Sequence, residues 1–364
     1  MSDAVASSAA GPVVSPGASP GASDSATAPI LDMSHVEVTF QARQGFLNSV
    51  PVTILQDVSV SLARAETLAV VGESGSGKTT LGRASLRLVP LTAGRVTFEG
   101  LDITTLPDNK LKAVRRRAQA IFQDPYSSLS PYMRLLDIVA EPLVIHGIGS
   151  SGERREQVVQ ALEQVRLRPA VDLLDRYPHT LSGGQRQRVN IARAMILEPT
   201  YVVADEPVSM IDASSRAEIL GLLRGFQEAR GVSYLYITHD LASARHFADR
   251  IAVMYLGRIV ELAEARELID HPLHPYSRAL MAAVPEPDPA NRKRIRAVVS
   301  GEPPSVMVAP AGCPFHPRCP QAMPGTCDVV DPPLIQLGAA PSSGTGHQVA
   351  CHLYPAPTGG PDST

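Results

Sequence analysis

Leu-Ser-Gly-Gly-Gln, residues 181–185, precedes a run of apolar residues at helical spacing in this 364-residue chain. It lies between two other segments whose composition suits phosphate chemistry. Upstream, residues 72–79 read GESGSGKT, a full match to the phosphate-binding pattern G-x-x-x-x-G-K-S/T. Downstream, residues 201–206 read YVVADE, an apolar run that ends in two carboxylates. The order of these three segments predicts a protein that binds a nucleotide.

Apolar runs on both sides of these motifs predict a mixed α/β fold. Thr67–Val71 is a continuous apolar run that leads into GESGSGKT, and residues 201–204 and Ser233–Ile237 are two more. Between the last two, residues 213–230 carry apolar side chains at helical spacing. Strand, helix and strand in this order predict an α/β core with a largely parallel sheet covered on both faces. Shorter β-like runs that predict an antiparallel layer are 36–40, 58–62 and 96–98.

Changes in composition divide the chain into four parts. Residues 1–29 are small, polar or Pro with almost no large apolar side chain, so we expect a disordered tail. Residues 30–272 form the expected nucleotide-binding domain, with a helical subdomain at about 124–184. A Pro-rich extension that contains the cysteines covers 273–354, and 355–364 is the second expected disordered tail.

Charge and hydropathy restrict the class of function. The net charge of −3 provides no general attraction to nucleic acid, and we expect no nucleic-acid partner. No stretch approaches the ~20 consecutive apolar residues that span a bilayer. The N-terminus lacks the basic and apolar regions of a secretory signal. Any membrane-spanning part is therefore expected on another polypeptide.

The GESGSGKT loop predicts the role of each of its residues. Gly72, Gly75 and Gly77 let the backbone wrap around phosphate, so that amide groups face the anion. Lys78 is expected to reach the β- and γ-phosphates of ATP, and the Thr79 hydroxyl to ligate Mg²⁺. A Gly/Ser-rich turn before a helix is the competing interpretation, but it does not account for the preceding strand and the Lys-Thr pair. Other candidate nucleotide-binding residues of this loop are Ser74 and Thr80.

Asp205 and Glu206 end an apolar run, and open α/β sheets bind ligands at the carboxyl ends of their strands. Asp205 is suited to bind the nucleotide's Mg²⁺, usually through water. Acidic residues at a strand end are otherwise often solvated starts of loops, so this pair is informative only because the phosphate loop is present. We expect both carboxylates at the nucleotide.

The three segments together resemble the ATP-binding cassette (ABC) family. The resemblance implies a P-loop domain with a RecA-like core, an antiparallel β subdomain and a helical subdomain, which hydrolyses ATP to ADP and phosphate. It implies that Glu206 is the general base, that Gln123 contacts Mg²⁺ or the attacking water, and that His239 contacts the γ-phosphate. The adenine requires an aromatic platform, for which Phe40 is the candidate and Phe46 the reserve.

The same resemblance implies that a second cassette completes the site. In the family, the segment at 181–185 binds the γ-phosphate held by the partner subunit, so that two cassettes close head to tail around two ATP molecules. Asp212 matches the D-loop aspartate, although Met210-Ile211 stands where the family more often has Ala-Leu. The residues expected at the partner's ATP are Ser182, Gly183, Gly184, Gln185 and Asp212.

Longer segments resemble the ATPases of oligopeptide/dipeptide importers. They are FQDPYSSLSP at 122–131, AEPL at 140–143, VMYLGRIVE at 253–261 and HPYSRAL at 274–280. The implied partners are a second ATPase subunit (a paralogue or another copy), two membrane permease subunits that dock on the helical insert and Gln123 loop, and indirectly an extracytoplasmic solute-binding protein. The implied location is peripheral, at the cytoplasmic face of the inner membrane. Peptides are the expected solute with oligosaccharides possible, and the alternative is a soluble ABC ATPase unconnected with transport.

All four cysteines lie in the C-terminal extension, at Cys313, Cys319, Cys327 and Cys351. In a cytosolic ATPase, clustered cysteines indicate metal binding and not disulfides. The tight C-x₂₋₄-C pair usual for structural zinc is absent, and four irregularly spaced cysteines suit an iron–sulfur cluster better. The resemblance implies a [4Fe–4S] cluster on these four thiols. Zinc with mixed ligands remains the alternative, because His316, His347 and His352 are close in sequence.

Overall fold

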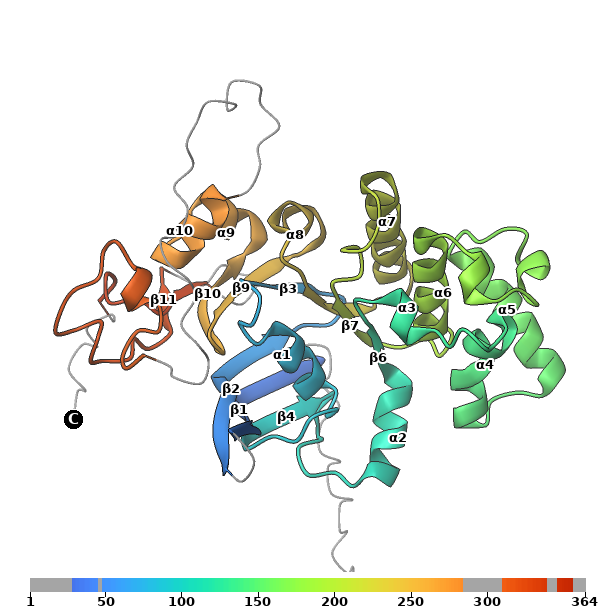
Figure 1. Cartoon of the computed structure of the whole chain (residues 1–364), viewed down its shortest axis with the longest axis horizontal. Helices are drawn as coiled ribbons and strands as arrows, with labels where there is room; N and C mark the ends of the chain where they lie inside the picture. The colour runs from blue at the N-terminus through green and yellow to red at the C-terminus, as the bar shows by residue number, and fades with distance from the viewer. Residues whose placement is uncertain (1–27, 45–47, 284–309, 339–345, 356–364) are drawn as a thin grey trace, which may run out of the picture.

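The computed structural model describes residues 28–44, 48–283, 310–338 and 346–355 (Figure 1). The strands are β1 (Leu31–Gln44), β2 (Asn48–Leu62), β3 (Thr67–Val71), β4 (Ala93–Phe98), β5 (Leu101–Asp102), β6 (Ala118–Ile121), β7 (Tyr201–Asp205), β8 (Ser233–Ile237), β9 (Arg250–Tyr255), β10 (Arg258–Glu264), β11 (Ile335–Leu337) and β12 (His347–Val349). The α-helices are α1 (Lys78–Ser85), α2 (Asp108–Arg117), α3 (Pro125–Ser128), α4 (Leu135–His146), α5 (Ser151–Gln164), α6 (Gly183–Met195), α7 (Ala213–Arg230), α8 (Leu241–Phe247), α9 (Ala265–Asp270) and α10 (Pro275–Ala282). The 3-10 helices are η1 (Ala170–Leu173), η2 (Pro178–Thr180) and η5 (His316–Arg318).

An eight-stranded sheet forms the centre of the molecule, with the order β11-β12-β10-β9-β3-β8-β7-β6. Neighbours from β9 to β6 pair in parallel, whereas β9, β10, β12 and β11 pair antiparallel. Every residue of β3, β7 and β8 is buried, which is why these strands are continuous apolar runs. The predicted α/β core is confirmed, and its parallel strands bring their carboxyl ends to one edge.

A second sheet, with the order β2-β1-β4-β5, is antiparallel and lies below the large sheet in Figure 1. The runs predicted at 36–40, 58–62 and 96–98 lie within β1, β2 and β4. Val36, Val38 and Leu55 are fully buried and share a core with Leu81 of α1. This sheet therefore supports the helix that follows the phosphate loop.

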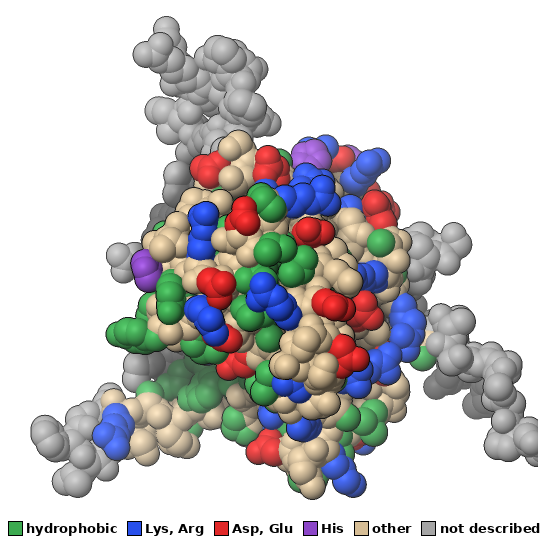
Figure 2. Space-filling model, turned by 90° about the vertical axis from the view of Figure 1, so that its right-hand side faces the viewer, with side chains coloured by type: hydrophobic (Ala, Val, Ile, Leu, Met, Phe, Trp, Pro, Cys, Tyr) green, Lys and Arg blue, Asp and Glu red, His purple; other side chains and the backbone are tan. Residues whose placement is uncertain are grey.

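The helices α3 to α6 form the separate group seen at the right of Figure 1. Ser150 caps α5 through a capping box with Glu153, because each residue binds the backbone amide of the other. Val158 and Leu162 of α5 are fully buried. Figure 2 shows this side of the molecule, where acidic and basic side chains are interspersed. Within the described residues, no helix combines the length and the apolar character needed to cross a membrane.

The described part of the C-terminal extension packs directly against the cassette. β12 pairs with β10, and Val349 lies opposite Glu261. Cys313, Phe315 and Cys327 belong to the same apolar core as β3 and β7. Extension and cassette therefore share one sheet and one core.

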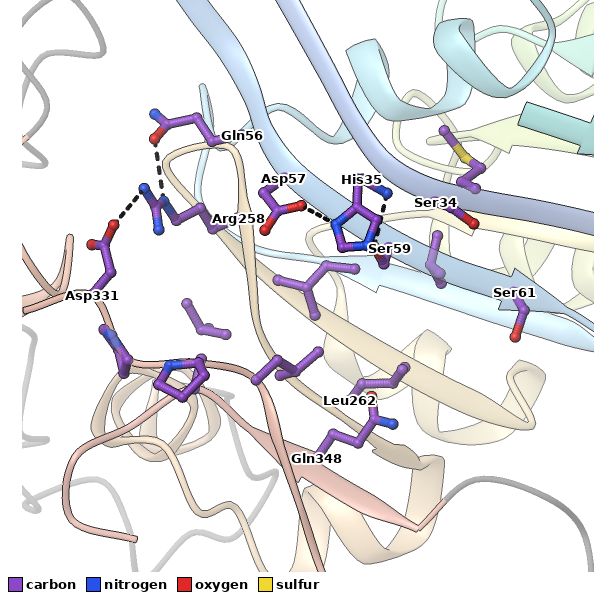
Figure 3. A pocket seen from close by; sticks show the side chains of 18 of the residues that line it. Ser34, His35, Gln56, Asp57, Ser59, Ser61, Arg258, Leu262, Asp331 and Gln348 are labelled. Atoms are coloured by element: carbon purple, nitrogen blue, oxygen red, sulfur yellow. Dashed lines mark hydrogen bonds and ion pairs between the residues drawn. The ribbon is translucent and has the colours of Figure 1, made fainter. Parts of the chain in front are cut away.

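A hollow of about 690 Å³ lies between β1, β2, β10 and the extension (Figure 3). Its charged groups already have partners. Arg258 binds Asp331 at 3.1 Å and Gln56 at 3.2 Å, and His35 binds Asp57 at 2.6 Å. This hollow presents paired charges of both signs and no single class of ligand chemistry.

Candidate active site

The phosphate loop leaves β3 through a turn that only glycine accommodates. Gly72 has φ +155°, and a Cβ there would lie 2.2 Å from the Met254 carbonyl oxygen. Gly77 caps α1 in the left-handed region, with φ 101°. The loop is therefore held against β9, and its amides precede the N-terminus of α1, where anions are favoured.

Lys78 lies inside this loop with only 7% of its surface exposed. Its ammonium donates to the carbonyl oxygens of Gly72 and Glu73, each at 2.8 Å. Burial lowers the pKa of Lys78, while the nearby carboxylates Glu206 and Asp205 act in the opposite direction. A buried ammonium held mainly by neutral oxygens is well placed to bind an anion.

Asp205 ends β7 beside Thr79, whose hydroxyl donates to the Asp205 carboxylate at 3.3 Å. Burial raises the pKa of Asp205, because the charged form loses hydration. A cation near this carboxylate would favour its charged form and so offset the cost of burial. A hydroxyl and a carboxylate this close together are hard oxygen ligands of the kind that Mg²⁺ prefers, so these two residues fit the expected metal.

Glu206 follows Asp205 in an unusual backbone conformation, with φ 46°. Its amide donates to the carbonyl of Ile237 on β8 at 2.8 Å, which holds this conformation. Non-glycine residues in the left-handed region are sparse and concentrate at functional sites. The strained backbone directs the Glu206 side chain to the sheet edge.

Each oxygen of the Glu206 carboxylate contacts a polar side chain from a neighbouring strand end. Gln123, two residues beyond β6, donates to Oε2 at 2.8 Å, and Nδ1 of His239, two residues beyond β8, lies 3.0 Å from Oε1. A carboxylate oxygen accepts hydrogen bonds, so this contact is a hydrogen bond in the imidazole form that carries its hydrogen on Nδ1. The three residues expected to act in catalysis come from three strands and meet at one carboxylate. A water molecule at this carboxylate could lose a proton to it.

The segment at 181–185 opens α6. Ser182 accepts a hydrogen bond from the amide of Gln185, and the Gln185 side chain accepts one from the Ser182 amide, at 3.3 and 3.0 Å. Both side chains are exposed. Among the described residues, no hydrogen bond joins this segment to the phosphate loop of the same chain. The segment therefore presents a capped, exposed helix N-terminus.

Asp212 lies close to this segment and caps α7 by accepting from the Ser215 amide at 3.0 Å. Its hydrogen bond from the Ser214 hydroxyl lowers the pKa of Asp212 to about 2. A Cβ on Gly184 would lie 3.4 Å from Ser215 Oγ, so the 181–185 segment and this turn are neighbours. Asp212 is thus an exposed anion beside the N-terminus of α6.

Other expected nucleotide contacts are less constrained. Phe40 lies on β1 opposite Val52 with 40% of its surface exposed, so its ring is open to stacking. Ser74 and Gly75 are exposed, and Thr80 is half-buried at the start of α1. Phe46, the reserve candidate for adenine, lies outside the described residues.

Two contacts to the phosphate loop were not predicted from the sequence. Tyr276 and Arg318 both bind Glu73, although they are 203 and 245 residues further along the chain. Neither residue belongs to a phosphate-binding motif, so local pattern carries no signal for them.

The four cysteines line one small cavity, together with His274 and Phe315. All four are free thiols. Burial raises the pKa of Cys313 to about 11, because a bare thiolate would lose hydration there. In the described part of the chain, no three His, Cys, Asp or Glu side chains are placed to hold a metal ion. The expected metal site is therefore not confirmed.

The histidines considered as zinc ligands have other partners. Nδ1 of His316 lies 2.9 Å from the carbonyl oxygen of Cys313, and Nε2 of His352 lies 2.8 Å from that of Val330. His347 binds the buried carboxylate of Glu261 at 2.7 Å. These nitrogens are occupied by the protein itself.

Comparison with known proteins identifies the family. Residues 55–209 match the model of the ABC transporter family, and residues 260–327 match the oligopeptide/dipeptide transporter C-terminal region. The oligopeptide transport ATP-binding protein AppF of Bacillus subtilis is 46% identical over 329 residues, which cover 89% of this chain and 97% of AppF. The chain belongs to the ABC transporter family.

Other matches agree with this assignment. A Brucella ovis protein, provisionally named a peptide import ATP-binding protein, is 46% identical over 323 residues, covering 89% of this ABC protein and 97% of the relative. The ATP-binding cassette MJ0796, solved as a dimer after hydrolysis with ADP and phosphate bound, superposes with a TM-score of 0.59. It is 29% identical and covers 65% of this chain and 99% of its own. The ABC cassette fold is confirmed, and the chain is an ABC-type ATPase.

Replacing Glu206 with Gln tests the role of its carboxylate. The amide keeps the shape of the side chain but cannot accept a proton, so we expect ATP turnover to fall by about 10²–10⁴-fold, the usual contribution of a general base. Binding of ATP should persist, because Lys78 and the loop are unchanged. Steady-state phosphate release and nucleotide titration measure the two quantities.

Glu163→Gln on the exposed surface of α5 is the matched control and should retain full turnover. Turnover within twofold of the unmodified protein in Glu206→Gln would contradict the assignment.

Proposed function

We propose that this chain is the ATP-hydrolysing subunit of a bacterial ABC importer that takes up peptides. The observation that carries the proposal is the full-length similarity to AppF, an oligopeptide transport ATP-binding protein, at 46% identity over 97% of AppF. The match to the oligopeptide/dipeptide transporter C-terminal region at residues 260–327 supports it independently of the cassette. An oligosaccharide or another related solute would change the permease and binding protein, and not the chemistry of this subunit.

The proposed chemistry assigns one task to each group at the sheet edge. Lys78 and the loop amides bind the β- and γ-phosphates, and Thr79 and Asp205 hold Mg²⁺ with Gln123 near it. The metal neutralises phosphate charge when bound. Glu206 accepts the proton of the attacking water, while Gln123 and His239 keep its carboxylate in place. When ATP is bound, His239 also contacts the γ-phosphate.

A partner cassette is proposed to complete each ATP site. Ser182, Gly183, Gly184 and Gln185 form an exposed helix N-terminus, whose dipole favours phosphate. Asp212 lies beside them and is proposed to join the same interface. MJ0796 was solved as a dimer, and its nucleotide state was post-hydrolysis. The partner is a second copy of this chain or a paralogue of it.

Ser182→Arg tests this trans arrangement. The bulky cation should block the partner's phosphate, and turnover should fall by about 10²-fold, the usual cost of losing a preorganised donor. ATP binding at Lys78 of the same chain should be unchanged. Ser150→Arg breaks an equivalent capping box on α5 and should leave turnover intact. Loss of ATP binding at the chain's own loop would overturn the partner-facing position.

A groove between α2, β6, α4 and α6 is proposed to receive a helix of the permease. Its volume is about 690 Å³, and Phe122 at its wall directly precedes Gln123. The exposed apolar side chains Leu88, Phe122 and Ile145 line it. A helix seated there would contact Phe122, so its movement would reach Gln123 and the Glu206 carboxylate. The groove thus offers a route by which hydrolysis is coupled to a permease. We propose two permease subunits, at the cytoplasmic face of the inner membrane, through which the solute-binding protein acts.

Ile145→Arg tests the transport function. Ile145 is 56% exposed, so a charge is tolerated in the free subunit, whereas burial against an apolar helix would be costly. We expect peptide uptake by reconstituted importer to fall at least about tenfold, as for a central interface residue. Hydrolysis by the chain without permease should be unchanged.

Val171→Arg, at an exposed position of η1 outside the groove, is the control and should transport normally. Normal peptide uptake by Ile145→Arg would contradict the docking site. Failure of the full-length protein to copurify with any permease would favour the soluble ATPase instead.

We also propose a [4Fe–4S] cluster on Cys313, Cys319, Cys327 and Cys351. Support comes from the fact that these four thiols line one cavity. A cluster spaces its thiolates more widely than a single ion does, so it does not require the close ligand group of a mononuclear site. Burial raises the pKa of Cys313, Cys319 and Cys351, and bonding to iron would offset this by favouring the thiolate form.

His274 provides a second argument for an acceptor in this cavity. It is fully buried, and burial lowers its pKa to about 4, so the ring is neutral. Nδ1 accepts a hydrogen bond from the Tyr276 amide at 3.0 Å, so the hydrogen of the neutral ring is on Nε2. That Nε2 has no hydrogen-bond partner among the residues that the structure describes. A buried N–H without an acceptor is costly, and the sulfur of a cluster would supply one.

Metal analysis after anaerobic purification tests the cluster. We expect brown protein with about four iron and four sulfide per chain, and loss of both in Cys319→Ser. His352→Gln is the control and should keep its iron. About one zinc per chain without iron would replace the cluster by the zinc alternative, and protein without either metal would overturn both.

A further inference from the structure

Glu73, the second residue of the GESGSGKT loop, is bound by the C-terminal extension. Both terminal nitrogens of Arg318, at the end of η5, donate to its carboxylate, with N···O distances of 2.8 and 3.1 Å. The Arg318 side chain is only 6% exposed, and the Glu73 side chain 27%. A bidentate pair of this kind has a defined geometry and is stronger than a single contact.

The backbone of Glu73 is held from a second direction. Its amide donates to the hydroxyl of Tyr276 on α10 at 2.8 Å. Arg318 also donates to the hydroxyl of Tyr255 on β9 at 3.3 Å. The rings of Tyr255, Tyr276 and Phe315 are all buried, with centroids 4.6 to 5.4 Å apart. The extension thus reaches the loop through a packed aromatic cluster.

The carbonyl of the same residue faces the catalytic side. It accepts from the Lys78 ammonium at 2.8 Å and from the Ser76 amide at 3.3 Å. Glu73 therefore binds Arg318 through its side chain and Tyr276 of α10 through its amide. Its carbonyl binds Lys78, the lysine expected at the phosphates. A shift of Arg318 would move a residue that directly contacts Lys78.

We propose that Arg318 is a positioning residue of the ATP site, which couples the folding of the C-terminal extension to the conformation of the phosphate loop. Because Arg318 adjoins Cys319, the state of the cysteine cavity reaches nucleotide binding by this path. Coupling is reciprocal, so nucleotide bound to the loop also stabilises the extension. This inference depends on ATP binding alone and is independent of the transported solute.

A second ion pair joins the extension to the cassette without touching the phosphate loop. Arg258 on β10 binds Asp331 of the extension at 3.1 Å, with side chains 32% and 50% exposed (Figure 3). Among its described partners are Asp331 and Gln56, and none is a residue of the phosphate loop. Exposed pairs contribute little, whereas removing one member of a buried pair leaves an unpaired charge. Arg258 therefore serves as a matched control for a purely structural link.

The test measures ADP binding to the full-length chain by calorimetry in the presence of Mg²⁺. Arg318→Gln should weaken binding by about fivefold or more, the lower end of typical coupling between sites. Glu73→Gln should weaken it similarly, and the double variant should bind no more weakly than either single variant. Arg258→Gln should bind ADP like the unmodified protein.

Hydrogen exchange provides the reciprocal measurement. Addition of ADP should slow amide exchange at residues 313–330 in the unmodified protein, and this protection should disappear in Arg318→Gln. A merely structural role would lower the thermal stability without changing the response to ADP. Arg318→Lys, which keeps the charge but cannot bind in bidentate fashion, should show an intermediate affinity.

Unchanged ADP affinity in Arg318→Gln, or strictly additive effects in the double variant, would overturn the proposal. If Arg318→Gln fails to fold, Tyr276→Phe is the second test. It removes the hydroxyl that accepts a hydrogen bond from the Glu73 amide, and it retains the ring. That variant should also weaken ADP binding with the same loss of protection at 313–330, and full affinity there would overturn the proposal as well.

Discussion

Parallel pairing of β3, β8, β7 and β6 is the constraint on which the active site depends. Ile237 lies opposite both Val70 and Asp205, and Ile121 lies opposite Ala204. In this register, the phosphate loop, Glu206 and His239 leave the sheet at the same edge, and Gln123 joins them. A shift of one residue would point each strand's side chains to the opposite face and separate these groups.

Burial at this edge gives the site its electrostatic character. Lys78 and Asp205 are both largely removed from water, and burial moves their pKa values in opposite directions, down for the ammonium and up for the carboxylate. The protein offsets neither shift fully, although Glu206 and Asp205 act against the shift of Lys78 and the Thr79 hydroxyl acts against that of Asp205. In the proposed mechanism, a nucleotide with its metal would supply both missing charges at once, with phosphate at the lysine and the cation at the aspartate. The same edge is linked to the extension through Glu73, so a segment far away in sequence shares in forming it.

The sequence predicts the core and the motif residues well, and for a physical reason. β3 and β8 are buried on both faces, so their apolar runs mark their bounds, and local motifs place Lys78, Glu206 and His239 at the ends of such runs. Pattern alone could not predict that β11 and β12 extend the same sheet, because three-residue strands carry no periodicity. It could not predict the contact of Arg318 with Glu73 either, since the pairing arises from tertiary packing. The sequence shows that the extension has four cysteines, but their meeting in one cavity depends on that packing.

In the proposed mechanism, each chain binds a nucleotide at its own phosphate loop and presents the exposed N-terminus of α6 to the nucleotide of a partner. A structure of the assembled importer with a non-hydrolysable ATP analogue and Mg²⁺ tests this most directly. It should place Lys78 and Thr79 at the phosphates and metal of the nucleotide in their own chain, with the partner's Ser182 at the γ-phosphate. A nucleotide whose γ-phosphate contacts Ser182 of the same chain, or that lies away from Lys78, would contradict the account.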